Sequence, residues 1–113
     1  MKPPEIRKYL FDISQACELL VQFSSGKTFE DYRQDALLRS AIERQFEIVG
    51  EALNQAIRLQ PGLANQISHS NRIIAFRNRL IHAYASVANE VVWDVLNSYL
   101  PRLQEEVRKL LDS

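Results

Sequence analysis

The densest group of polar side chains that could do chemistry falls within eight residues of the sequence. In chain order it contains Arg77, Asn78, Arg79, His82 and Tyr84. The fork of an arginine matches the oxygens of a phosphate, and a histidine can accept or donate a proton near neutral pH. Metal-free cleavage of RNA needs both abilities, because a base must activate the 2′-hydroxyl and a cation must stabilise the charged phosphorane.

The spacing within this group predicts how a helix would arrange it. Asn78 and His82 would lie roughly 40° apart around a helix, so the amide could hydrogen-bond the imidazole and fix its tautomer. Arg77 and His82 would lie roughly 140° apart around the same helix. A long arginine side chain, a helix that ends at His82, or a second chain across a two-fold axis could close that gap.

Each of these side chains also has an ordinary structural interpretation. A histidine at the end of a helix, such as His82, is often a cap that the helix dipole favours. Arg77 and Arg79 could be surface charges, and Tyr84 could be an amphipathic residue of a loop. The residue types alone leave the catalytic and the structural interpretations open.

The charge distribution is uneven although the total is balanced. The chain carries 14 basic and 14 acidic residues, yet residues 52–89 contain no aspartate or glutamate and have a formal charge of +4. The remaining residues carry 10 basic against 14 acidic side chains. A basic segment can offer a local site for an anion, although charges also scatter by chance in a short chain.

Length and composition exclude several classes of protein. The chain has 113 residues, of which 46% are hydrophobic, as in a single packed domain. Three glycines and four prolines are too few for a β-rich fold with many tight turns. Cys17 is the one cysteine, so we expect no internal disulfide and no thiolate zinc site. We also expect no cofactor. Because no apolar run could span a bilayer and no signal peptide begins the chain, we expect a cytoplasmic protein that does not bind a membrane.

Apolar residues recur at three- and four-residue spacing, which predicts an all-α bundle of four main helices. The expected helices cover residues 4–23, 34–59, 70–82 and 89–111. Pro101 lies inside the last apolar stripe, and because the period continues through it we expect a kink and not a break. Gly50, beside the second stripe, would allow the backbone of a neighbour to approach closely.

Turn and cap residues mark the ends of these helices. Gly26 is available for a left-handed cap, and Thr28 with Asp31 can form a capping box for a short helical turn. Pro61 and Gly62 stop the second long helix. We expect Ser70 or Asn71 to cap the third helix.

Other polar or reactive residues have simpler interpretations. Glu43, Glu47 and Glu51 share a helix face, where we expect solvated carboxylates paired with Arg39 or Arg44, although Glu51 could instead anchor an arginine of the third helix. His69 has no partner that the sequence reveals. We expect Cys17 in the core, and Trp93 in the core or in a dimer contact.

The segment from Arg77 to Tyr84 resembles the Arg-x4-His-x-Tyr signature of HEPN-domain toxins of the HepT type. Further segments are similar to the same family: residues 46–52 look like its Gly-Glu-Ala segment, and residues 91–93 and 100–103 look like its final helix. The resemblance covers nearly the whole chain. One departure is Val87-Ala88, since the family commonly has an aspartate after the valine; Asn89 could take over that helix cap.

The resemblance implies a fold, an activity and partners. It implies a single HEPN domain over residues 1–113, which forms a two-fold homodimer whose motifs meet in one cleft. It implies a metal-independent endoribonuclease, with Arg77 and His82 catalytic and with Asn78, Arg79 and Tyr84 supporting them. The implied partner is an MntA-type nucleotidyltransferase antitoxin that transfers AMP from ATP to Tyr84. The adenylate would add bulk and negative charge beside the motif and compete with RNA phosphate.

Three functions are therefore compatible with the sequence. The first is a toxin ribonuclease of a toxin–antitoxin pair. The second is a catalytically silent helical dimer that acts as a binding module for a nucleotidyltransferase. The third is a nucleotide-binding bundle, although the chain contains no phosphate-binding loop. The intact motif from Arg77 to Tyr84 favours the first.

Overall fold

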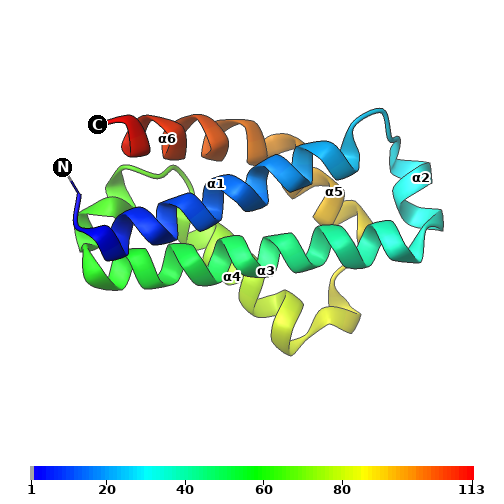
Figure 1. Ribbon diagram of the computed structural model, residues 1–113. Helices are drawn as coiled ribbons and strands as arrows, with labels where there is room; N and C mark the ends of the chain where they lie inside the picture. The colour runs from blue at the N-terminus through cyan, green and yellow to red at the C-terminus, as the bar shows by residue number, and fades with distance from the viewer. Residues whose placement is uncertain (1) are drawn as a thin grey trace.

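The computed structural model describes residues 2–113, and these residues form helices without any β-strand (Figure 1). The predicted all-α class is therefore confirmed. The elements are α1 (Pro4–Ser24), α2 (Phe29–Gln34), α3 (Ala36–Leu59), the 3₁₀ helix η1 (Pro61–Asn65), α4 (Ser70–His82), the 3₁₀ helix η2 (Tyr84–Ser86), α5 (Asn89–Ser98) and α6 (Leu100–Asp112).

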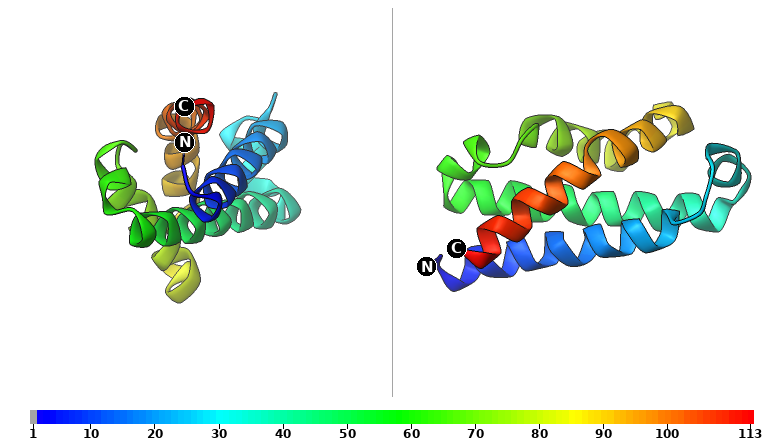
Figure 2. Two further views of the ribbon diagram at one scale, coloured as in Figure 1. Left: turned by 60° about the vertical axis from the view of Figure 1, so that its left-hand side comes forward. Right: turned by 90° about the horizontal axis from the view of Figure 1, so that it is seen from above.

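The two longest helices, α1 and α3, run side by side and form the centre of the bundle (Figures 1 and 2). Helix α6 packs on α1, whereas α4 packs on α3. The apolar residues of α1 recur at three- and four-residue spacing, and six of them are buried: Ile6, Leu10, Ile13, Ala16, Cys17 and Leu20. Tyr9 and Phe23, which continue the same period, are partly buried. The α1 stripe meets the stripe of α3, which contributes Ile42, Phe46, Val49, Ala52, Leu53 and Ala56. Hydrophobic burial along this seam is the main source of stability of the fold.

Cys17, which was expected in the core, is found there, and Trp93, which was expected in the core or in a dimer contact, packs partly buried against it. Cys17 is fully buried, and this burial raises the pKa of its thiol to about 12. Trp93 packs against two aromatic rings: its centroid lies 5.4 Å from that of Tyr32 and 6.3 Å from that of Phe29. Trp93 thus joins α5 to α2, as expected for a core contact.

The turn between α1 and α3 follows the predicted chemistry. Gly26 has a φ of 73°, in the left-handed region that glycine adopts without strain. The Thr28 hydroxyl accepts a hydrogen bond from the Asp31 N–H at 3.1 Å, and the Asp31 carboxylate accepts one from the Thr28 N–H at 2.9 Å. This capping box starts α2, and Asp35 then caps α3. The long helix begins two residues later than predicted, because Gln34 belongs to α2.

The predicted caps of the later helices are wrong. His69, not Ser70 or Asn71, is the N-cap of α4. Ser70 is already helical and buried, and its hydroxyl donates to the Ala64 carbonyl at 3.3 Å. Asn89 is likewise the first residue of α5 and not its cap, which is Ala88. Neither helix has a side-chain hydrogen bond at its N-cap, and the turn before α4 is held by the hydrogen bonds from Ser68 to Glu106.

The expected single helix with a kink at Pro101 is instead two helices. α5 ends at Ser98 and α6 begins at Leu100, so only Tyr99 separates them. The Pro101 ring has no N–H to donate to the carbonyl four residues earlier, and it crowds that carbonyl. The apolar period continues through the junction because Leu96, Leu100 and Leu103 all remain buried.

The C-terminal end of α4 and the following η2 project away from the rest of the bundle. Figure 1 and the left view of Figure 2 show this segment in yellow, on the side of α3 that lies opposite α6. The motif histidine and tyrosine therefore lie at the most protruding part of the described chain. No helix within residues 2–113 is long and apolar enough to cross a lipid bilayer.

Candidate active site

The site begins where α4 crosses α3 at Gly50. A Cβ atom on Gly50 would overlap the Cβ and Cγ atoms of Arg77. Only a residue without a side chain allows this approach, as the sequence predicted for Gly50. The glycine thereby brings the first residue of the motif against the long central helix.

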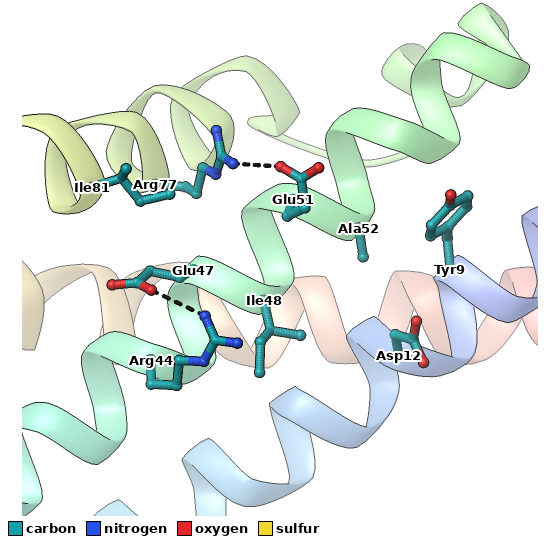
Figure 3. A pocket seen from close by; sticks show the side chains of 9 residues that line it. All are labelled: Tyr9, Asp12, Arg44, Glu47, Ile48, Glu51, Ala52, Arg77 and Ile81. Carbon is teal, nitrogen blue, oxygen red and sulfur yellow. Dashed lines mark hydrogen bonds and ion pairs between the residues drawn. The ribbon is translucent and has the colours of Figure 1, made fainter.

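Arg77 is held by an ion pair with the residue next to that glycine. Its Nη2 donates to the Glu51 carboxylate, and its side chain is only 20% exposed (Figure 3). The second oxygen of Glu51 accepts from Gln55 Nε2 at 2.9 Å. The suggestion that Glu51 anchors an arginine of the third helix is confirmed. A guanidinium held at a fixed place is a suitable partner for a phosphate.

Asn78 has a different partner from the one expected. Its Oδ1 accepts a hydrogen bond from Arg77 Nη1 at 2.7 Å, so the amide orients the arginine and not the imidazole of His82. The expected hydrogen bond between Asn78 and the exposed His82 ring is not formed among the described residues. The buried Nε of Arg77 has no hydrogen-bond partner among the described residues.

Arg77 and His82 are not brought together within one chain. Arg77 packs against α3, whereas His82 and Arg79 are exposed. No hydrogen bond or ion pair between described residues joins Arg77 to His82, in agreement with their separation of roughly 140° around the helix. Tyr84 follows in η2 with 70% of its surface exposed. Its phenol is therefore accessible to another macromolecule.

A pocket of about 240 Å³ opens beside Arg77, between α1, α3 and α4 (Figure 3). Both walls carry charged side chains: Arg44 pairs with Glu47 at 3.2 Å on α3, and Asp12 lies on α1. Its other lining residues are Tyr9, Ile48, Glu51, Ala52 and Ile81. His82 and Tyr84 do not line it, so this pocket does not by itself contain the whole motif.

Sequence reasoning missed the contribution of α1 to this region. Tyr9 and Asp12 of α1 line the same pocket as Arg77, although they precede it by more than 60 residues (Figure 3). No local spacing links them to the motif, because only the packing of α1 on α3 places them there. Within residues 2–113 no group of three histidine, cysteine or carboxylate side chains could hold a metal ion.

Comparison with known proteins gives consistent matches along the chain. Residues 13–110 match the family described as ribonuclease HepT-like. A candidate RNase of Caldanaerobacter subterraneus subsp. tengcongensis is 32% identical over 111 residues, which cover 98% of this chain and 96% of that relative. A probable ribonuclease HepT of Thermococcus cleftensis is 33% identical over 108 residues, 92% of this chain and 94% of that relative. No solved structure gives a significant match.

These matches confirm the resemblance that the segment from Arg77 to Tyr84 suggested. The family match includes the Gly50–Glu51 crossing, α4 with its motif, and both C-terminal helices. The two relatives extend the similarity to nearly the full length of each protein. The chain therefore belongs to the ribonuclease HepT-like family.

Proposed function

We propose that this ribonuclease is the toxin of a toxin–antitoxin pair and cleaves RNA internally without a metal ion. The observation that carries the proposal is the arrangement of α4, which holds Arg77 in an ion pair with Glu51 and exposes His82 at its protruding end. The fixed cation and the accessible imidazole supply the two groups that this chemistry needs.

In the proposed reaction His82 takes the proton from the 2′-hydroxyl of a ribose. The 2′-oxygen then attacks the adjacent phosphorus, and the bond from phosphorus to the 5′-oxygen of the next nucleotide breaks. Arg77 stabilises the negative charge on the phosphorane, and the leaving 5′-oxygen takes up a proton from an acid in the site or from water. The products are a 2′,3′-cyclic phosphate and a 5′-hydroxyl.

The wide separation of Arg77 and His82 around α4 supports a two-fold homodimer as the active species. A second copy of the single domain, residues 1–113, would place its own His82 near the Arg77 of the first. The end of α4 protrudes and little of the bundle surrounds it, so a second copy could approach it without a steric clash (Figure 1).

Tyr84 is proposed as the point of neutralisation by an MntA-type nucleotidyltransferase. Its oxygen would attack the α-phosphorus of ATP, so that AMP is transferred to the phenol and pyrophosphate leaves. The exposure of Tyr84 supports this, because a transferase must reach the hydroxyl. The new phosphodiester would stand two residues from His82 and repel the phosphate of incoming RNA.

The decisive experiment measures cleavage of a labelled RNA by the purified protein in the presence of EDTA. We expect undiminished cleavage, products that end in a 2′,3′-cyclic phosphate, and a sedimenting species of about twice the monomer mass. Intact mass after co-expression with a nucleotidyltransferase encoded beside this protein should rise by increments of one AMP. Loss of cleavage in EDTA would contradict the metal-independent mechanism.

One observation favours a second candidate, a catalytically silent binding module for a nucleotidyltransferase. Within the described chain two of the five N–H groups of Arg77 already donate to Glu51 and Asn78, and its Nε is buried, so part of the guanidinium is not available to RNA. If this candidate is correct, the purified dimer binds the transferase but does not cleave the labelled RNA. Replacing His82 then leaves the result of the cleavage assay unchanged.

A further inference from the structure

A second polar cluster lies at the opposite end of α4 from His82 and Tyr84. The His69 ring stacks on the Tyr99 ring with centroids 5.0 Å apart and planes inclined by 10°. Arg72 Nη1 donates to the Tyr99 hydroxyl at 3.4 Å. These side chains come from the turn before α4, from α4 itself and from the α5–α6 junction. The proposed cleavage step uses none of them.

His69 is held in a backbone conformation that histidine adopts infrequently. Its φ of 59° and ψ of 26° lie in the left-handed region, and no other non-glycine residue of the described chain has a positive φ. The residues on both sides are anchored. Glu106 accepts hydrogen bonds from the Ser68 N–H and hydroxyl at 2.9 and 2.7 Å, and Ser70 is buried.

This anchored turn presents His69 as a platform. One face of the imidazole lies on Tyr99, and the residue as a whole is exposed, so we take the face turned away from Tyr99 as the one that a ligand can reach. Residues that are held in an unfavourable backbone region by their surroundings are frequent at binding sites. An open aromatic face that is fixed from below can stack on an unpaired base.

The flank of α4 that leads from this platform is basic. Arg72 and Arg79 are exposed and seven residues apart, so they lie on the same side of the helix, and His82 follows near its end. No carboxylate occurs between residues 52 and 89. Glu106, which approaches the turn from α6, is engaged by Ser68 and lies 3.7 Å from Arg102. The flank is therefore suited to a phosphate backbone.

We infer that the His69–Tyr99 stack and Arg72 form a binding subsite for single-stranded RNA, separate from the Arg77 and His82 motif. An unpaired base stacks on the open face of His69, Arg72 contacts its phosphate, and the strand follows α4 past Arg79 to His82. The inference rests on the proposed function, since it assigns the path of the RNA substrate. It deepens that function by requiring a substrate with several unpaired nucleotides.

The first test measures RNA binding on a His82→Ala background, so that the RNA stays intact. A fluorescent single strand of about ten nucleotides is titrated by polarisation at two salt concentrations. His69→Gly and His69→Asn both suit the left-handed backbone and remove the ring, and each should weaken binding about tenfold. Arg72→Gln should weaken it severalfold and reduce the salt slope by about one.

Arg58→Gln is the matched control for Arg72→Gln. Arg58 is an exposed arginine of the same acid-free segment, but it belongs to α3 and touches neither ring of the stack. This variant should bind RNA as its parent does. Equal binding by the His69, Arg72 and Arg58 variants would overturn the subsite.

The second test compares the cleavage of long and short substrates with His82 intact. The thirteen residues of α4 span roughly 20 Å, and stacked bases of one strand are about 3.4 Å apart, so a dinucleotide at His82 cannot reach His69. His69→Gly should lower the ratio of kcat/KM between the ten-nucleotide strand and the dinucleotide about tenfold. An equal loss on both substrates, or a changed sedimentation coefficient, would contradict the subsite and indicate a disturbed motif or a dimer contact. If the wild-type protein cleaves neither substrate, the proposed function fails, while the binding test still decides the subsite.

Discussion

The two halves of the motif on α4 lie in contrasting surroundings. Arg77 is locked against α3 by Glu51, Asn78 and the close approach at Gly50, so it belongs to the folded body of the protein. His82 and Tyr84, only five and seven residues later, stand exposed on the segment that projects from it (Figure 1). Substitutions around Arg77 should therefore affect both stability and activity, whereas substitutions at His82 and Tyr84 should affect activity or regulation alone.

Among the variants, His82→Ala is expected to show the largest loss of activity without a loss of stability. Losing the proposed proton acceptor should lower kcat/KM for RNA by a factor of about 100 or more. The melting temperature should stay unchanged, because His82 is exposed and its side chain makes no hydrogen bond within the described residues. Cleavage kinetics and thermal unfolding on the same preparation measure both quantities. An unfolded variant would instead assign His82 a structural role at the end of α4.

Gly50→Ala should affect stability and activity together. The added methyl group would overlap the Arg77 side chain, so α4 must move away from α3 at a cost of about 1–3 kcal/mol in the free energy of unfolding. The displaced guanidinium should also reduce cleavage. Denaturant unfolding and RNA cleavage test this.

Gly62→Ala is the matched control, since a Cβ there meets no atom within 4 Å. That variant should keep both the stability and the activity of the parent protein. If Gly50→Ala is as stable as Gly62→Ala, the close approach of the two helices is not needed.

Glu51→Gln should show whether activity depends on the exact position of the Arg77 guanidinium, because this variant keeps the arginine itself. The amide keeps the shape of the side chain but replaces a charge-assisted hydrogen bond with a weaker one, so the guanidinium becomes less well fixed. We expect about a tenfold loss of kcat/KM, since misplaced catalytic groups lose rate steeply. Stability should change by less than about 1 kcal/mol, because Glu51 is 46% exposed.

Glu47→Gln serves as the control for this variant. Glu47 lies one turn earlier on α3 and pairs with Arg44 instead of the motif arginine. It should leave cleavage nearly unchanged. Equal losses in the two variants would indicate a general effect of charge in the pocket and not the positioning of Arg77.

The sequence alone predicted the helices well because each buries one continuous stripe. The apolar period of α1 predicted its six buried residues, although Tyr9 and Phe23 of the same stripe are only partly buried, and the Thr28–Asp31 cap followed from local spacing. The sequence also indicated that Glu51 could bind an arginine of α4, which the close approach at Gly50 makes possible. These are features that the chain specifies locally or through one helix face.

Features that depend on tertiary contacts escaped prediction. The Asn78 amide binds Arg77, whose guanidinium is also bound to Glu51 of α3. The spacing of residues within α4 does not reveal this contact with α3. His69 became the cap of α4 because Glu106, 37 residues later, holds the preceding Ser68. At Pro101 the helix is interrupted for one residue, Tyr99, because proline cannot donate its backbone hydrogen bond, although the apolar period continues.

The smallest effect on the isolated enzyme is expected for Tyr84→Phe. This variant tests whether the exposed tyrosine serves regulation and not cleavage. The ring remains and only the hydroxyl is lost, and because Tyr84 is 70% exposed, folding should be unaffected. If the phenol serves only as the acceptor of AMP, the variant should inhibit growth as the parent does and should resist the nucleotidyltransferase. If the hydroxyl also contacts RNA or orients His82, part of the cleavage is lost as well, so growth alone would be ambiguous. Mass spectrometry separates the two cases, because co-expressed parent protein should carry adenylate on a peptide that contains Tyr84 and the variant should carry none there. Adenylate on Tyr9, Tyr32 or Tyr99, with Tyr84 unmodified, would contradict the assignment to Tyr84.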